Sequence, residues 1–186
     1  MPPRATTLLW RACPVLVGVM SDSHDNLANV RKAAGIFNEL GVDLVIHLGD
    51  IVAPFTLIEL AGSLKARIEA VYGNNCGERE GLRRAASKVG AGIRDPPHTL
   101  TLDGKRILLL HGFGSPENTV EIVDALAESR KWDAVLYGHT HDSDLRYRRG
   151  VLVLNPGETG GWLGEPSVAV LDTTTLKARI IWLGEK

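Results

Sequence analysis

The 186-residue sequence is poor in cysteine and carries almost no net charge. It has only two cysteines, Cys13 and Cys76, which excludes a disulfide-stabilised scaffold and a cysteine-rich zinc module. So few cysteines suit a reducing compartment, and we expect a cytoplasmic protein. Lysine plus arginine number 21 and aspartate plus glutamate 22, so the formal net charge is −1 and the sequence lacks the positive charge of a dedicated nucleic-acid-binding protein. An apolar content of 44% excludes disorder, and the length predicts a single domain over residues 1–186.

The sequence also lacks a convincing membrane segment. The apolar stretch over residues 8–20 is too short to span a bilayer, and Arg11 and Pro14 interrupt it. A secretory signal is one interpretation of this stretch, but no small-residue cleavage site follows it. We therefore expect an irregular leader over residues 1–13, then a buried strand, and no membrane partner.

Beyond the leader, the hydrophobic pattern alternates between strands and helices, and it changes to mainly strands after residue 141. Helices are expected over residues 27–40, 54–64, 78–89 and 116–129. Strands are expected over residues 15–20, 44–48, 68–72, 99–102, 106–110, 134–137, 145–147, 151–154, 168–171 and 178–183. Asp103-Gly104 predicts a hairpin turn. This layout predicts an α/β fold in which two packed sheets are flanked by helices.

Metal-capable side chains follow five of these strands directly. They are Asp22, His24, Asp50, Asn74, His111, His139 and His141. Loops at the carboxyl ends of parallel strands meet in one crevice, so we expect these groups to gather there. Asp22 and His24, like His139 and His141, are two residues apart, and an extended backbone would point both members of each pair to one face. Glycines at 49, 73, 112 and 138 would let the backbone approach closely.

Seven such donors are too many for one tetrahedral zinc ion and suit two ions that share a carboxylate. Nitrogen and oxygen donors without a thiolate fit Mn, Fe, Ni or Zn, and Mg less well. Each motif alone has an ordinary structural explanation, such as a helix cap, a turn or a buried histidine. The five motifs together, each at a strand end, indicate a metal site.

At these residues the sequence resembles the calcineurin-like metallophosphoesterases, in particular their small single-domain YfcE-type phosphodiesterase branch. The matching motifs are Ser21-Asp22-Ser23-His24, Leu48-Gly49-Asp50, Gly73-Asn74, His111-Gly112, Gly138-His139-Thr140-His141 and Asn155-Pro156-Gly157. The resemblance covers about residues 15–183 and implies a four-layer sandwich of two sheets between helices. It implies Asp22, His24 and His141 as ligands of one ion, Asn74, His111 and His139 as ligands of a second, and Asp50 as the bridging carboxylate.

The resemblance implies a metal-dependent phosphoric ester hydrolase, foremost a phosphodiesterase acting on a small phosphodiester. A hydroxide that bridges the two ions would be the nucleophile, and Asp50, Asn74 and His111 are the residues that we predict to be catalytic. Manganese is the expected ion, with Ni, Fe, Zn or Mg as alternatives. A phosphomonoesterase, or a non-catalytic scaffold like the retromer subunit of the same superfamily, stays open as another function. Relatives often form dimers or tetramers, so a homodimer or homotetramer is also open.

The sequence departs from the family pattern at two places. Asn75 follows the motif asparagine, where larger family members have a histidine that assists the leaving group, so substrates with good leaving groups are favoured. Glu158 follows the Asn-Pro-Gly turn where a serine is common, and the sequence does not indicate its effect. Trp162, in the loop from Gly160 to Gly164, could line a substrate pocket or an oligomer contact, and the sequence does not distinguish between these two roles.

Overall fold

The computed structural model describes residues 15–184, so the leader expected over residues 1–13 lies outside the described residues. Four helices are present within that range: α1 (Leu27–Leu40), α2 (Pro54–Ser63), α3 (Arg79–Val89) and α4 (Pro116–Glu128). Asn26 caps α1 by accepting a hydrogen bond from the Asn29 backbone, and Ser115 caps α4 in the same way from Asn118. None of the helices within residues 15–184 has the length and apolar character that crossing a bilayer requires.

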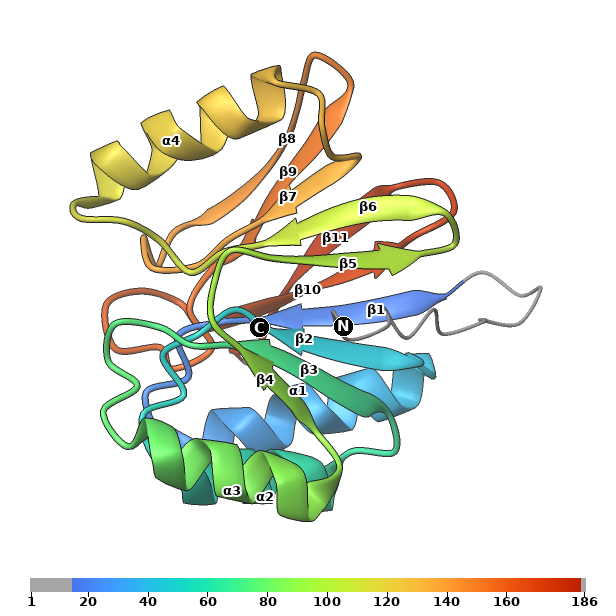
Figure 1. Cartoon of the computed structure of the whole chain (residues 1–186). Coiled ribbons are helices and arrows are strands. Elements are labelled where there is room, and N and C mark those ends of the chain that lie inside the picture. Colours follow the sequence, from blue (N-terminus) through green and yellow to red (C-terminus); the bar gives the residue numbers. More distant parts are fainter. Residues whose placement is uncertain (1–14, 185–186) are drawn as a thin grey trace, which may run out of the picture.

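The strands form two sheets that pack against each other (Figure 1). In spatial order, the six-stranded sheet contains β11 (Lys177–Trp182), β10 (Ser167–Asp172), β1 (Leu16–Met20), β2 (Leu44–His47), β3 (Arg67–Val71) and β4 (Gly92–Arg94). The five-stranded sheet contains β5 (His98–Leu102), β6 (Lys105–Leu109), β7 (Ala134–Leu136), β9 (Val151–Pro156) and β8 (Ser143–Arg148). Both sheets are mixed, with β1 to β4 parallel in one and β6, β7 and β9 parallel in the other.

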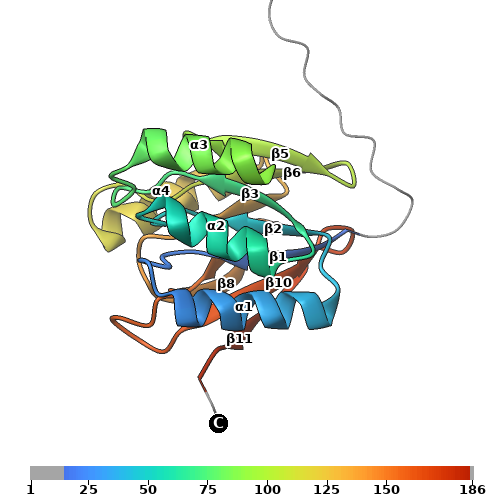
Figure 2. The same cartoon turned by 90° about the horizontal axis from the view of Figure 1, so that it is seen from below.

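Helices α1, α2 and α3 cover the outer face of the six-stranded sheet, and α4 covers the five-stranded sheet (Figures 1 and 2). The alternation of side chains along the strands explains these layers. Val17 and Val19 of β1 pack into the core between the sheets, whereas Met20 packs with the α1 residue Phe37 beneath the helices. Along β9, Leu152 faces the inter-sheet core and Val153 faces α4. The predicted architecture of two packed sheets flanked by helices is therefore confirmed.

The expected elements match the structure with one omission. The hairpin at Asp103-Gly104 joins β5 to β6, in a register that pairs Leu102 with Lys105. The short edge strand β4 was not expected from the sequence. It has three residues, of which only Ile93 is a large hydrophobic, so it lacks the alternating pattern that identifies longer strands.

Candidate metal centre

The seven predicted donors come together at one end of the two sheets, where the loops after β1, β2, β3, β6 and β7 meet (Figure 1). Backbone hydrogen bonds hold these loops to one another. Asp22 N donates to Gly49 O at 3.0 Å, which joins the loops after β1 and β2. Gly138 N donates to His111 O at 2.9 Å, which joins the loops after β6 and β7 of the five-stranded sheet. Between the two sheets, the backbone N of His139 donates to the side-chain Oδ2 of Asp22 at 3.0 Å. The expected convergence of strand ends is therefore present, with contributions from both sheets.

A first group of donors surrounds Oδ1 of Asp22. Nε2 of His141 lies 3.6 Å from this oxygen, and Nε2 of His24 lies 3.9 Å from it. Asp22 is fully buried, and the two imidazoles are about one-fifth exposed. These three atoms are close enough together to hold one metal ion.

A second group of donors surrounds the amide oxygen of Asn74. Nε2 of His111 and Nδ1 of His139 each lie 2.9 Å from Asn74 Oδ1. The rings of the two histidines meet edge to face, with centroids 5.2 Å apart. One amide oxygen and two ring nitrogens thus face a common point beside the first group.

Asp50 lies between the two groups and turns one carboxylate oxygen toward each. Its Oδ2 is 3.6 Å from His24 Nε2 in the first group, and its Oδ1 is 3.4 Å from His111 Nε2 in the second. The Asp50 side chain is 1% exposed. A carboxylate in this position could contact a cation in either group.

Two of the histidines hydrogen-bond a backbone carbonyl through one ring nitrogen and turn the other ring nitrogen toward the site. His111 Nδ1 donates to the Leu48 carbonyl at 2.8 Å, so its Nε2 can carry the lone pair. His139 Nε2 donates to the Gly114 carbonyl at 2.7 Å, so its Nδ1 can likewise carry the lone pair. Partners of this kind orient ligand histidines in metalloproteins.

Unsatisfied buried atoms also fit a metal site. Asp22 Oδ1 and His24 Nε2 are buried and have no hydrogen-bond partner among residues 15–184. Leaving a buried carboxylate oxygen unpaired costs free energy, because the group has lost its hydration. A divalent cation would satisfy both atoms at once, so the residues present fit such an ion.

The electrostatics of the site favour positive charge. Burial alone would raise the pKa of Asp50, but contacts with His111 and hydrogen bonds from Asn75 hold it well below its usual value. Burial alone would lower the pKa of His111, but Asp50 and Asp22 raise it above its usual value. The cluster therefore stabilises a proton on His111, and a cation in the same field would be stabilised for the same reason.

The backbone around the donors differs from our expectation. Each i, i+2 pair would point to one face only on extended backbone, and this condition is not met, because φ is positive at Asp22, His24, His139 and His141. The left-handed turns separate the second pair. His141 faces Asp22 and His24, while His139 faces Asn74 and His111.

The site glycines lie where a side chain would collide with the candidate donors, as expected. A Cβ on Gly73 would overlap the Asp50 carboxylate, and a Cβ on Gly138 would lie 2.8 Å from Oδ2 of Asp22. Gly49 has φ of 105°, which side-chain-bearing residues rarely adopt. The donors are therefore packed directly against neighbouring backbone.

Glu158, whose effect the sequence did not indicate, contacts a candidate metal ligand. It is fully buried, and its Oε2 accepts a hydrogen bond from Nδ1 of His141 at 3.0 Å. Burial alone would raise the pKa of Glu158, but hydrogen bonds from His141 and from backbone amides keep it below its usual value. This carboxylate fixes the His141 ring with Nε2 toward Asp22. The partners are 17 residues apart, so no local sequence signal marks the contact.

Asn75, which stands where larger family members have a histidine, hydrogen-bonds both carboxylate oxygens of Asp50. Its backbone N donates to Oδ1 of Asp50, and its side-chain Nδ2 donates to Oδ2, both at 2.7 Å. These two bonds fix the orientation of the central carboxylate. The neighbouring Cys76 is buried, and its sulfur accepts a hydrogen bond from Gly73 N at 3.3 Å.

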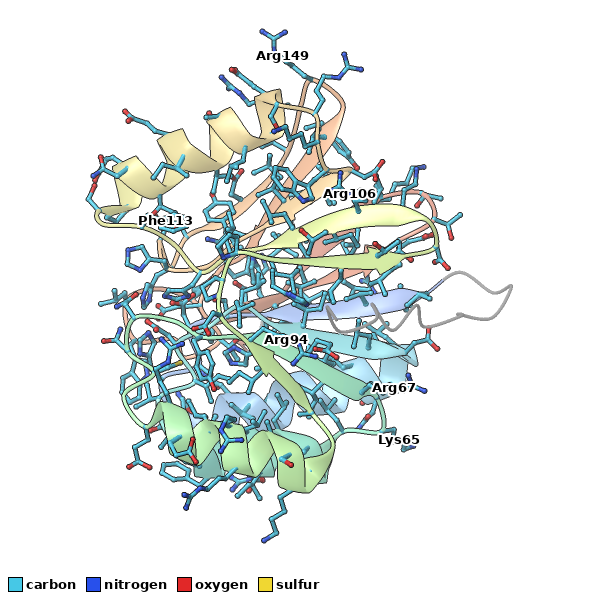
Figure 3. The ribbon with its side chains drawn as sticks, viewed as in Figure 1. Lys65, Arg67, Arg94, Arg106, Phe113 and Arg149 are labelled. Carbon is cyan, nitrogen blue, oxygen red and sulfur yellow. The ribbon has the colours of Figure 1, made fainter. Side chains whose placement is uncertain are left out.

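His47 and the α3 arginines lie outside the two donor groups. His47 is 1% exposed, and its Nε2 lies 3.0 Å from the hydroxyl of Ser23. Ser23 is the residue between the donors Asp22 and His24 in the sequence. On α3, Arg83 and Arg84 form exposed ion pairs with Glu80. The labelled cations Lys65 and Arg67 lie at the other end of the six-stranded sheet, away from Phe113 (Figure 3).

Known proteins resemble this chain over most of its length. The calcineurin-like phosphoesterase superfamily domain matches residues 15–176. Phosphodiesterase MJ0936 of Methanocaldococcus jannaschii is 38% identical over 169 residues, which are 90% of this chain and 98% of that protein. Phosphodiesterase YfcE of Escherichia coli K12 is 27% identical over 151 residues, or 74% of this chain and 75% of the relative.

Solved structures share the fold. A structure described as a novel archaeal phosphodiesterase is 37% identical, with a TM-score of 0.82 over 90% of this chain and 99% of that one. Vacuolar protein sorting 29 from Cryptosporidium parvum has a TM-score of 0.60 over 91% of this chain and 96% of its own, at 17% identity. The second likeness concerns the fold alone.

Proposed function

Because the chain belongs to the calcineurin-like phosphoesterase superfamily, we propose that it is a metal-dependent phosphodiesterase with a dinuclear centre, in which a hydroxide shared by two ions is the nucleophile. The position of Asp50 carries the proposal. It directs one carboxylate oxygen toward each of two donor groups, at 3.6 Å from His24 and 3.4 Å from His111. Two ions sharing such a carboxylate supply electrostatic stabilisation for in-line displacement at phosphorus.

The two donor groups divide the ligands. Asp22, His24 and His141 would hold one ion, and Asn74, His111 and His139 the other. Asp50 would contact both ions. Manganese is the ion that we favour, since the set mixes imidazole, carboxylate and amide donors.

The surrounding residues position these ligands. Asn75 keeps both oxygens of Asp50 pointing at their groups through its two hydrogen bonds. An amide cannot deliver a proton to a leaving alkoxide, because its N–H is not acidic near neutral pH. We therefore propose small phosphodiesters with a good leaving group, such as an aryl oxide, as substrates. A homodimer or homotetramer, and a cytoplasmic location, stay predictions.

Hydrolysis of two aryl esters tests the proposal. Protein stripped with a chelator is assayed on bis(p-nitrophenyl) phosphate and on p-nitrophenyl phosphate, with and without added Mn²⁺. We expect hydrolysis only with metal and a higher kcat/KM for the diester. Asp50→Asn should lower kcat/KM at least about a hundredfold, because altering even an outer partner of a metal ligand has effects of that size.

Asp172→Asn is the matched control, since Asp172 pairs with Leu16 at the far end of β1 and lies away from the site. Preference for the monoester would replace the diesterase proposal with a phosphomonoesterase. Absence of turnover of either ester with Mn²⁺, Ni²⁺, Fe²⁺, Zn²⁺ or Mg²⁺ would favour the binding scaffold. Near-normal activity of Asp50→Asn at saturating metal would refute the dinuclear assignment.

A further inference from the structure

The segment of residues 158–164, between β9 and β10, lies at the same end of the molecule as the candidate metal centre (Figure 1). Its backbone is hydrogen-bonded to the loops that carry the donors. Glu158 N donates to His141 O at 3.2 Å, and Gly160 N donates to Asp22 O at 3.0 Å. This segment therefore borders the first donor group directly.

The turn at residues 162–164 is held from inside by Glu158. The buried carboxylate accepts backbone hydrogen bonds from Trp162 at 3.1 Å and Leu163 at 2.7 Å, and a third from Gly164. On the other side, the carbonyl of Gly160 accepts from the side-chain amide of Asn26 at 2.7 Å. These bonds fix the backbone of the turn, although it lies at the surface.

Two large apolar side chains stand exposed on this fixed turn. Trp162 is 63% exposed and Leu163 is 79% exposed. A Cβ added to Gly160 would lie 2.7 Å from Cδ1 of Trp162 and 3.0 Å from the backbone oxygen of Asp22. The edge of the indole therefore packs on Gly160 beside a candidate metal ligand, and much of the ring is left open to solvent.

We propose that Trp162 binds the organic group of the phosphoester substrate, and that this group is planar and aromatic, such as an aryl ring or a nucleobase. The proposal rests on the proposed function, which places the phosphoryl group at the adjoining metal centre. An indole offers a flat, electron-rich face that aromatic rings stack on. Because the turn is already fixed, stacking requires little further ordering of the protein.

Two phosphonates distinguish the contribution of an aromatic ring to binding from that of the anionic head group. Phenylphosphonate and methylphosphonate carry the same head group, and only the first has an aromatic ring. Their dissociation constants are measured by calorimetry on the Mn²⁺-loaded protein. The wild-type chain should bind phenylphosphonate about tenfold more tightly than methylphosphonate, the size expected for one stacked ring.

Trp162→Ala should remove this preference by weakening phenylphosphonate alone, and Trp162→Phe should restore most of it. The control is Tyr147→Ala, another exposed aromatic on β8, at the end of the sheets remote from the site. A wild-type protein without preference, or a Trp162→Ala variant that keeps it, would overturn the inference even if ester hydrolysis is normal. If Trp162→Ala binds both phosphonates like the wild-type protein but forms a smaller assembly in light scattering, Trp162 belongs to a contact between copies and the inference is wrong. Failure of the wild-type chain to hydrolyse any phosphoester would overturn the proposed function separately.

Discussion

Replacing Glu158 with glutamine tests how the fold prepares His141 for a metal ion. The carboxylate accepts four hydrogen bonds, two on each oxygen: Oε2 from His141 and Trp162, Oε1 from Leu163 and Gly164. Glutamine keeps only one acceptor oxygen, so its NH₂ group must face two N–H donors in either orientation. If that group faces His141, the ring has to accept at Nδ1 and carry its proton on Nε2. Nε2 is the atom that lies 3.6 Å from Asp22 in the first donor group.

We expect Glu158→Gln to weaken Mn²⁺ binding about ten- to a hundredfold, the usual effect of losing an outer partner of a ligand histidine. That range corresponds to about 1.4–2.8 kcal/mol of binding free energy. The free energy of unfolding of the metal-free protein should fall by about 1–3 kcal/mol, because a buried acceptor is replaced by a donor. Calorimetric titration with Mn²⁺ and urea unfolding measure the two quantities.

Glu165→Gln provides the control, because Glu165 is exposed in the same connection between β9 and β10. This variant should bind Mn²⁺ like the wild-type protein. A Glu158→Gln protein that is less stable but has unchanged Mn²⁺ affinity would refute the reasoning, since Glu158 would then act only on the fold.

Two further predictions concern the buried interior. Burial lowers the pKa of His47 from 6.5 to about 3, so below pH 6.5 the unfolded chain binds a proton that the folded chain does not. Between pH 6.5 and 5, the free energy of unfolding of the metal-free protein should therefore fall by about 2 kcal/mol more in the wild type than in His47→Gln. Urea titration at the two pH values measures both losses, and equal losses would contradict the prediction. A Cβ at Gly18 would lie 2.7 Å from ring carbons of Phe37. Gly18→Ala should therefore lower the free energy of unfolding by about 1–3 kcal/mol, as measured by thermal denaturation. Combining it with Phe37→Leu should recover part of the loss, and an unaltered melting temperature for Gly18→Ala alone would disprove the close packing.

Much of the fold followed from short-range patterns in the sequence. Buried strands such as β1 are continuous apolar runs, and Asp103-Gly104 marks a two-residue hairpin turn. The gathering of the donors followed from the rule that the carboxyl ends of parallel strands lie at one edge of a sheet. The rule worked for both sheets, because the sheets pack with these edges at the same end of the molecule (Figure 1).

The finer geometry depends on contacts between distant residues, and the sequence does not encode such contacts locally. The separation of His139 from His141 arises from positive φ angles, which the pattern of an i, i+2 pair does not reveal. The contact of Glu158 with His141 requires the β9–β10 connection to pass beside the loop after β7. Asn75 could be identified as a departure from the family pattern, but its hold on Asp50 became visible only in three dimensions.

The left-handed backbone at the candidate donors restricts which amino acids can be exchanged there. Positive φ occurs at Asp22, His24, Asp50, His139 and His141. Aspartate and histidine enter this region more readily than most side-chain-bearing residues, and they also bind metals. At each of these positions, one residue therefore has to tolerate a left-handed turn and also provide an atom that can bind a metal. A longer donor such as glutamate would retain the charge but fit the turn less well, so chemical similarity alone is a poor guide to tolerated substitutions at this centre.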